Sequence, residues 1–89
     1  MRKYKIEYTR DAKKKLAKMD AKMSKRITEW IKKNLDGCEN PRLHGLPLTG
    51  SLRDYWRYRV GDYRIVADIQ DDKIIIVIVN VDKRSDIYK

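Results

Sequence analysis

The amino-acid sequence predicts an α+β fold in which two N-terminal helices pack on one face of a twisted, mainly antiparallel sheet. Three patterns indicate this fold: a short alternating segment at the N-terminus, an amphipathic stretch through the first half, and three apolar segments in the second half. The expected order of elements is therefore β-α-α-β-β-β. A length of 89 residues leaves room for one hydrophobic core, so we expect a single domain over residues 1–89.

The first expected strand lies in the N-terminal segment YKIEY. Tyr4, Ile6 and Tyr8 alternate there with charged residues, a pattern that is typical of a half-buried strand. This strand leads directly into the helical part of the chain.

Two amphipathic helices are expected over residues 10–18 and 21–35, with Thr9 and Asp20 as N-caps and Gly37 after the end of the second. Their apolar side chains recur at intervals of three and four residues, so they form a stripe that faces the sheet. The members of this stripe are Ala12, Leu16, Met19, Met23, Ile27, Trp30, Ile31 and Leu35.

Residues 36–53 hold three of the four glycines and both prolines, which predicts a loop with one turn of structure. His44 lies in this loop without a second histidine or an acidic pair nearby, so we expect neither a general base nor a metal ligand there. Cys38 is the only cysteine and has no CxxC partner, so it indicates an incidental thiol and a reducing, cytoplasmic environment.

Three strands are expected over residues 55–60, 63–70 and 73–82. Gly61 and Asp62 form a two-residue hairpin loop between the first two, and Asp71 and Asp72 separate the second from the third. The last strand contains the run IIIVIVNV. An unbroken apolar run favours a central strand that is covered on both faces, or one face that lies under a partner.

A two-residue turn fixes the register of the first hairpin. It places Arg59 directly opposite Arg64 and Arg57 opposite Val66, with all three arginines on one face of the sheet. The other face is apolar and must pack against the helices, so the arginines point to the open side. The apolar face consists of Trp56, Tyr58, Val60, Tyr63, Ile65 and Ala67.

The same reasoning through the second turn pairs Arg64 with Val79 and Ile65 with Ile78. It assigns Ile74, Ile76 and Ile78 to the helix-covered face and Ile75, Val77 and Val79 to the open face. Because the last strand returns toward the Gly61 turn, Arg84 and Tyr88 can reach the arginine pair.

The chain carries a formal net charge of +9, and most of it lies in residues 1–50, which hold 14 Lys or Arg against 6 Asp or Glu. Such a surface attracts phosphate backbones without reading sequence. The alternative is a solvated helix face whose lysines serve solubility. The candidate nucleic-acid contacts are Lys13, Lys14, Lys18, Lys22, Lys25 and Lys83.

Two explanations of the arginines follow from the residues, and the residues alone leave both open. Directly opposed cations destabilise a sheet by up to about 1 kcal/mol unless they have a partner. In one explanation nearby acids pair with them, namely Asp54, Asp62, Asp68, Asp82 or Asp86. In the other, Arg57, Arg59, Arg64 and Arg84 converge on a phosphate, and Tyr88 stacks on a base.

The segment YWRYRVGDYRIVADI, followed by VDKRSDIYK, resembles the RelE/ParE superfamily of toxins from toxin–antitoxin systems. The resemblance also covers the PRLHGLPLTG loop and the basic first half, so it runs nearly end to end. It implies a RelE-like endoribonuclease that enters the ribosomal A site, binds ribosomal RNA and cuts mRNA, and a cognate antitoxin that masks it. The site residues that it implies are Arg57, Arg59, Arg64, Arg84 and Tyr88.

The chemistry that this resemblance implies is attack of the mRNA 2′-oxygen on the adjacent phosphorus, with no metal and no cofactor. RelE-type members usually carry lysines where this chain has Arg57 and Arg59. Because arginine stays protonated, it is a poor general base, so we expect one of the two to stabilise negative charge on the 2′-oxygen. The tail between Arg84 and Tyr88 is shorter than in that branch. No histidine stands near the C-terminus, which argues against a Glu/His pair.

Two other functions remain open at this stage. A ParE-like toxin on the same fold would poison DNA gyrase without cutting nucleic acid, and a third possibility is an inert nucleic-acid- or antitoxin-binding module. We expect no membrane partner and a cytoplasmic location, because no apolar run approaches the roughly 20 residues that span a bilayer and the N-terminus lacks the apolar region of a signal peptide.

Overall fold

The computed structural model describes residues 3–48 and 55–83 of the chain. Its elements are, in order, β1 (Lys5–Tyr8), α1 (Arg10–Lys18), α2 (Ala21–Asn34), the 3₁₀ helix η1 (Pro41–Leu43), β2 (Leu46–Pro47), β3 (Trp56–Val60), β4 (Tyr63–Gln70) and β5 (Ile75–Lys83). The strands form one sheet in the order β1-β5-β4-β3-β2. Only the β1–β5 pair is parallel among these strands. The predicted α+β class and its mainly antiparallel sheet are confirmed, and β2 is an additional short strand within the predicted loop.

Both predicted helix N-caps are confirmed. The Thr9 hydroxyl accepts a hydrogen bond from the Ala12 backbone N–H at 3.1 Å, and an Asp20 carboxylate oxygen accepts one from the Met23 N–H at 3.3 Å. Each bond satisfies one of the N–H groups that a helix leaves without an internal partner. The caps therefore set where α1 and α2 begin, and with them the face that each helix turns to the sheet.

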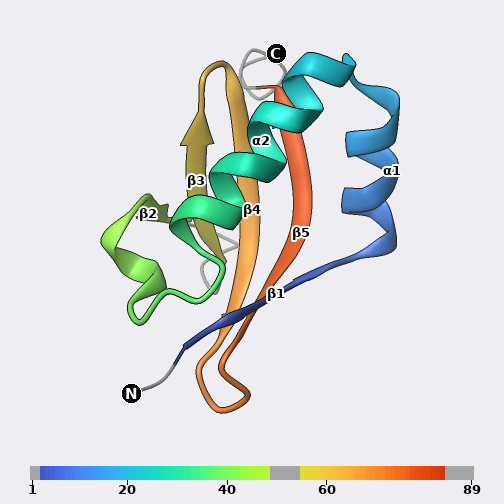
Figure 1. Ribbon diagram of the computed structural model, residues 1–89. Helices are drawn as coiled ribbons and strands as arrows, with labels where there is room; N and C mark the ends of the chain where they lie inside the picture. Colours follow the sequence, from blue (N-terminus) through green and yellow to red (C-terminus); the bar gives the residue numbers. More distant parts are fainter. Residues whose placement is uncertain (1–2, 49–54, 84–89) are drawn as a thin grey trace.

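The helices cover one face of the sheet (Figure 1), where α2 lies across β3, β4 and β5 and α1 lies beside β5. The predicted apolar stripe supplies the helical half of the core, and alternate strand residues supply the other half. The largest fully buried side chains are Tyr58, Ile27, Ile31, Leu35, Ile65, Ile76, Ile78, Val81 and Pro41. Among the described residues, the opposite face carries no helix, so it is the face available for a site.

The register predicted for the β3–β4 hairpin is confirmed. Arg59 is paired with Arg64 and Arg57 with Val66, on either side of a two-residue turn. Gly61 has a φ of +58°, as a type II′ turn requires at its first central residue. The arginines therefore alternate with the core residues Tyr58, Val60, Ile65 and Ala67, while Val66 is buried on the same side as the arginines.

The register predicted for β4 and β5 is wrong, because the turn between them is longer than two residues. It spans residues 71–74, so that Gln70 pairs with Ile75. Ile74 has a φ of +56°, a conformation that a β-branched residue rarely adopts. Its carbonyl accepts a hydrogen bond from the Lys5 N–H at 3.1 Å, and its side chain packs against the core.

A β-bulge shifts the pairing of β5 by one further residue. Ala67 pairs with Ile78 and Val66 with Asn80, so Val79 is the extra residue on β5. Arg64 consequently lies opposite Asp82 rather than Val79. The assignment of Ile76 and Ile78 to the core, and of Ile75 and Val77 to the open face, holds because the longer turn moves the register by two residues. The bulge then brings Val81 into the core opposite Ile65 and turns Asn80 and Asp82 outward.

Hydrogen bonds anchor the loop before β2 to the sheet. The Tyr58 hydroxyl donates to the Pro41 carbonyl at 2.6 Å, and the Trp56 indole donates to the His44 carbonyl at 2.6 Å. The Arg42 guanidinium makes two bonds of 3.0 Å to the Asp71 carboxylate, in the β4–β5 turn. These contacts hold β2 against β3 next to Arg57.

Gly45 provides a test of this anchoring. Its φ is +77°, and a Cβ there would lie 2.0 Å from the Arg57 carbonyl oxygen. We expect Gly45→Ala to lower the free energy of unfolding by at least about 3 kcal/mol, since backbone strain and a clash with backbone add. Gly37→Ala is the matched control, because Gly37 has a φ of +78° with nothing within 4 Å. It should cost only about 1–2 kcal/mol. Equal losses in urea unfolding would show that the close approach to β3 is unimportant.

Candidate functional site

Three arginines gather on the sheet face that the helices leave open. Arg59 is exposed, and Arg57 and Arg64 are partly buried, whereas Tyr58, their neighbour on the opposite face, is fully buried. Directly paired residues in a sheet have Cβ atoms about 5 Å apart, so the Arg59–Arg64 pair places two arginine side chains next to each other on this face. The geometry predicted for these three residues is confirmed. Arg84 and Tyr88 lie outside the described residues.

The acids of the described chain do not neutralise this face. An Asp82 oxygen accepts a hydrogen bond from the Lys15 ammonium at 2.9 Å, and its other oxygen accepts one from the Asn80 amide at 2.5 Å. Asp68 accepts a bond from the Gln70 amide at 2.9 Å. The salt bridges within the described ranges are Lys15–Asp82, Lys25–Glu29 and Arg42–Asp71. The explanation in which nearby acids pair with the arginines therefore finds no support there, while Asp54 and Asp86 lie outside the described residues.

Arg64 carries a further sign of an unmet interaction. Its Nε atom is buried and has no hydrogen-bond partner within residues 3–48 and 55–83. A buried donor without an acceptor costs about 1–3 kcal/mol. Such costs are uncommon in native proteins and are accepted where a group is needed for binding or chemistry. Arg64 thus combines like-charge repulsion from Arg59 with an unsatisfied donor on one side chain.

The predicted lysine contacts divide into two groups. Lys14 and Lys18 of α1 line a groove of about 460 Å³ together with Val79 and Asn80 of β5, and Asn80 is paired with Val66 beside the arginines. The structure therefore brings this part of α1 to the border of the arginine face. The other exposed candidates, on the outer surface of the helices or at the end of β5, are Lys13, Lys22, Lys25 and Lys83.

The shifted tyrosine and cysteine pKa values belong to the framework rather than to the open face. Burial raises the pKa of Tyr58 well above its usual range, which keeps the hydroxyl protonated for its bond to Pro41. Burial also raises the pKa of the Cys38 thiol, so the thiol is less reactive than a free cysteine. Hydrogen bonding to Asp71 raises the pKa of Arg42.

No group of His, Cys, Asp or Glu side chains in the described part of the chain is arranged to hold a metal ion. His44 is exposed, and its ring makes an edge contact with Trp30 at a centroid distance of 5.8 Å. No helix in the described ranges is long and apolar enough to cross a membrane.

Sequence reasoning missed two features of this site, the position of Asp82 opposite Arg64 and the approach of Lys15 from α1. A signal for the first was present. Within VIVNVD, Asn80 and Asp82 fall on the same alternation as the buried Ile76 and Ile78, so only a bulge could keep both polar residues out of the core. The Lys15–Asp82 contact joins residues 67 positions apart, and no local sequence pattern predicts it.

Comparisons with known proteins identify this fold with its basic open face as a small toxin-type domain. A family model described as the ParE toxin of type II toxin–antitoxin systems matches residues 6–88. A RelE-like toxin protein of Escherichia coli is 30% identical over an alignment of 89 positions, which covers 96% of this chain and 90% of that protein. Toxin RelG of Mycobacterium tuberculosis is 30% identical over 86 residues, covering 97% of each.

Solved structures give the same result. The toxin–antitoxin complex RelBE2 of Mycobacterium tuberculosis contains a chain with 28% identity and a TM-score of 0.84, with coverage of 96% of this chain and 95% of that one. The isolated RelE toxin of E. coli has 24% identity and a TM-score of 0.72 over 96% of this chain and 90% of its own, which shows a shared fold. The chain belongs to the ParE toxin family, within the RelE/ParE superfamily, as its resemblance predicted.

The opposed arginines predict an unusual response to mutation. Arg59→Thr should leave the free energy of unfolding unchanged or raise it by up to about 1 kcal/mol, because it removes a like-charge cross-strand pair and introduces a good strand former. Any gain should shrink as salt screens the repulsion. Arg57→Thr is the control, since Arg57 faces the uncharged Val66. Urea unfolding at low and high salt measures both, and a larger loss for Arg59→Thr than for Arg57→Thr would contradict the expectation.

Proposed function

We propose that this toxin is a ribosome-dependent endoribonuclease that cuts mRNA in the A site and so inhibits translation in the cytoplasm. The observation that supports this most is the open face with Arg57, Arg59 and Arg64, none of which has an ion-pair partner among the described residues. Guanidinium groups bind phosphate oxygens through charge-assisted hydrogen bonds. A phosphodiester would relieve the repulsion within this cluster and satisfy the donors of Arg64.

The proposed reaction is an in-line displacement at phosphorus. The 2′-oxygen forms a bond to the adjacent phosphorus as it loses its proton, and the bond to the 5′-oxygen breaks as that oxygen gains a proton. The products are a 2′,3′-cyclic phosphate and a 5′-hydroxyl. Arg64 and Arg84 would hold the phosphoryl oxygens while negative charge builds on them, and Arg57 or Arg59 would stabilise the 2′-oxygen. Tyr88 would stack on a base and lend a proton.

In this proposal the ribosome positions the mRNA, and so supplies the orientation that a small site cannot provide alone. The exposed lysines of the helices and of the end of β5 would contact ribosomal RNA through its phosphates. The candidates for that role are Lys13, Lys14, Lys18, Lys22, Lys25 and Lys83.

A cognate antitoxin is the other partner that we propose. The structural relatives include toxin–antitoxin complexes of RelBE2 from Mycobacterium tuberculosis and of RelE and RelB from Pyrococcus horikoshii. Ile75 and Val77 form a partly buried apolar strip on the open face of this chain. A segment of an antitoxin that covers this strip could also neutralise the arginines.

A second candidate function is inhibition of DNA gyrase without cleavage of nucleic acid. Two observations favour it: the matching family model is that of ParE toxins, and Arg57 and Arg59 stand where RelE-type members usually carry lysines. The two candidates predict different products, cut mRNA or gyrase-dependent DNA breaks, so the products must decide between them.

The first test of the nuclease is Arg64→Ala. Loss of one comparable group that stabilises transition-state charge lowers rates by about 10²–10³, and we expect a similar loss in cleavage of translated mRNA. Lys73→Ala is the control, because Lys73 is an exposed residue in the β4–β5 turn, at the end of the sheet opposite the Gly61 turn. Primer extension on mRNA from a reconstituted translation reaction measures both rates. If Arg64→Ala cleaved mRNA at the wild-type rate, Arg64 would have no role in the mechanism.

The second test examines the chemical ends of the fragments. We expect the downstream fragments to accept phosphate from polynucleotide kinase without prior phosphatase treatment, since each begins with a 5′-hydroxyl. The upstream fragments should carry a 2′,3′-cyclic phosphate that mass spectrometry detects. Intact messages together with gyrase-dependent DNA breaks would support the second candidate instead, and 5′-phosphate ends would contradict attack by the 2′-oxygen.

A further inference from the structure

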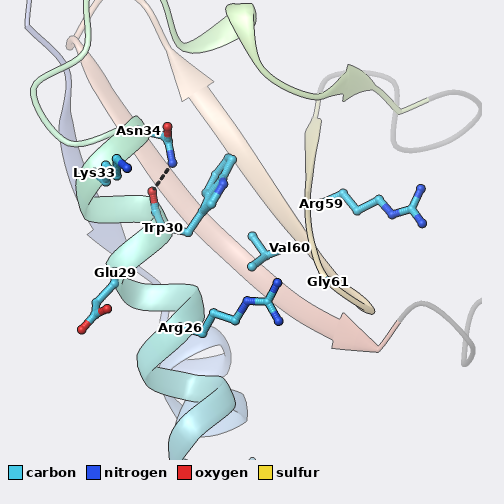
Figure 2. Close-up of a pocket in the computed structure, with 8 residues that line it drawn as sticks. All are labelled: Arg26, Glu29, Trp30, Lys33, Asn34, Arg59, Val60 and Gly61. Atoms are coloured by element: carbon cyan, nitrogen blue, oxygen red, sulfur yellow. Dashed lines mark hydrogen bonds between the residues drawn. The ribbon is translucent and has the colours of Figure 1, made fainter.

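A groove of about 560 Å³ lies between α2 and the turn end of β3. Arg26, Trp30 and Lys33 line it from the helix, and Arg59 and Gly61 line it from the hairpin (Figure 2). Arg59 also belongs to the arginine face described above. The groove is therefore continuous with that face around the end of β3.

Arg26 is directed at the hairpin turn. A Cβ atom placed on Gly61 would lie 3.3 Å from an Arg26 guanidinium nitrogen and 3.6 Å from its central carbon, so the guanidinium rests against the bare backbone of the turn. In Figure 2, Arg26 reaches toward Val60 and Gly61 from α2, and Arg59 extends on the other side of β3. Two guanidinium groups thus flank the end of this strand.

The groove has a net positive charge. Glu29 is the one acid among the described residues that line it, and its carboxylate lies 3.9 Å from the Lys25 ammonium. Figure 2 shows the Glu29 side chain on the far side of α2 from Arg59. Arg26, Lys33 and Arg59 have no salt bridge within the described residues.

The spacing of these cations fits a nucleic-acid strand. Arg26 and Lys33 are seven positions apart on α2, or about 10.5 Å along the helix axis at about 1.5 Å per residue. This matches the rise of about three stacked nucleotides at about 3.4 Å each. An acidic peptide would need apolar anchors, but the Trp30 ring is already packed against Tyr58 and His44 at centroid distances of 5.6 and 5.8 Å, and Val60 is buried.

We propose that the α2–hairpin groove binds the phosphate backbone of an RNA strand through Arg26, Lys33 and Arg59, as an extension of the arginine face. This assignment rests on the proposed function, because it takes the ligand of that face to be RNA. It adds a binding path that the catalytic arginines alone do not provide.

The test is binding of a fluorescent oligoribonucleotide with 2′-O-methyl groups, which cannot be cut by attack of the 2′-oxygen. For single strands, the slope of log K against log salt changes by about 0.7 for each phosphate contact. The double variant Arg26→Gln with Lys33→Gln should therefore lower the slope by about 1.4, which corresponds to about 25-fold weaker binding at 0.1 M salt. Fluorescence anisotropy between 50 and 300 mM salt measures both quantities.

The matched control is Lys5→Gln with Lys73→Gln, which removes the same charge from exposed positions on β1 and in the β4–β5 turn. Its slope should stay at the wild-type value. Equal slopes for the two double variants would overturn the proposal. It would also be overturned if Arg26→Gln with Lys33→Gln lost binding to an acidic peptide while its binding to RNA stayed intact. Because the oligonucleotide cannot be cut, this outcome is independent of whether the wild-type toxin cleaves translated mRNA.

A second inference comes from the pairing of Arg64 with Asp82 on neighbouring strands. A carboxylate directly opposite a guanidinium normally forms a charge-assisted hydrogen bond with it. Here Lys15 and Asn80 take the two carboxylate oxygens of Asp82, at 2.9 and 2.5 Å, and Nε of Arg64 is left without a partner in the described chain. We infer that Lys15 is a positioning residue that draws Asp82 away from Arg64 and so keeps the guanidinium ready for phosphate.

This inference also rests on the proposed role of Arg64, and a rescue experiment tests it. Lys15→Gln should lower cleavage of translated mRNA about tenfold, as Asp82 turns to Arg64. Adding Asp82→Asn to that variant should restore cleavage to within about twofold of wild type, whereas adding Asp62→Asn, which removes the same charge from the hairpin turn, should not. The free energies of unfolding of these variants, measured in urea, should not follow the order of their cleavage rates.

Two outcomes would overturn it: full activity of Lys15→Gln, or equal rescue by Asp62→Asn and Asp82→Asn. If the wild-type toxin cut no translated mRNA, the result would instead contradict the proposed function. In that case the affinity of the same variants for the 2′-O-methyl oligonucleotide should follow the same order.

Discussion

The two-residue reversal at Gly61 and Asp62 is the constraint on which the candidate site depends. Since side chains alternate along a strand, a slip of one residue would turn Tyr58 and Ile65 out to water and drive the arginines into the core. Burying a large apolar side chain stabilises a fold by about 1.5–3 kcal/mol, and an unpaired buried charge costs far more. The packing of β3 and β4 against α2 therefore holds the guanidinium groups on the open face, despite their mutual repulsion.

The bulge in β5 is a second backbone feature that determines which side chains face the open side of the sheet. With regular pairing, the register set by the 71–74 turn would place Asn80 and Asp82 in the core, on the same alternation as Ile78. The extra residue at Val79 reverses that alternation, so Val81 becomes buried and Asp82 faces outward. This outward turn brings Asp82 within reach of α1. The bulge thereby joins the helical layer to the site, because the carbonyl of Val79 also accepts a hydrogen bond from Thr9 at the start of that helix.

The open face of this toxin departs from what stability alone would favour. Arg59 and Arg64 repel each other, and the buried Nε of Arg64 has no hydrogen-bond partner within the described chain. Asp82, which is paired with Arg64 in the sheet, is engaged by Lys15 and Asn80 instead. Native proteins break local rules in this manner mainly at functional sites, where the rest of the structure compensates. The core beneath β3 and β4 and the anchored loop beside Arg57 provide that compensation, and the groove beside α2 extends the same positive charge around the end of the hairpin.

The sequence by itself determined the two helices and the strands other than β2, the helix caps, the face of the β3–β4 hairpin that carries the arginines, and the superfamily. Each of these depends on local chemistry: alternation, capping residues, turn residues and a motif that is continuous along the chain. Tertiary structure alone decided the pairing of β1 with β5, the register of β5, the contact of Lys15 with Asp82 and the groove between Arg26 and Gly61. These features join residues far apart in the chain, so packing and long-range hydrogen bonds select them, and no local pattern encodes their geometry.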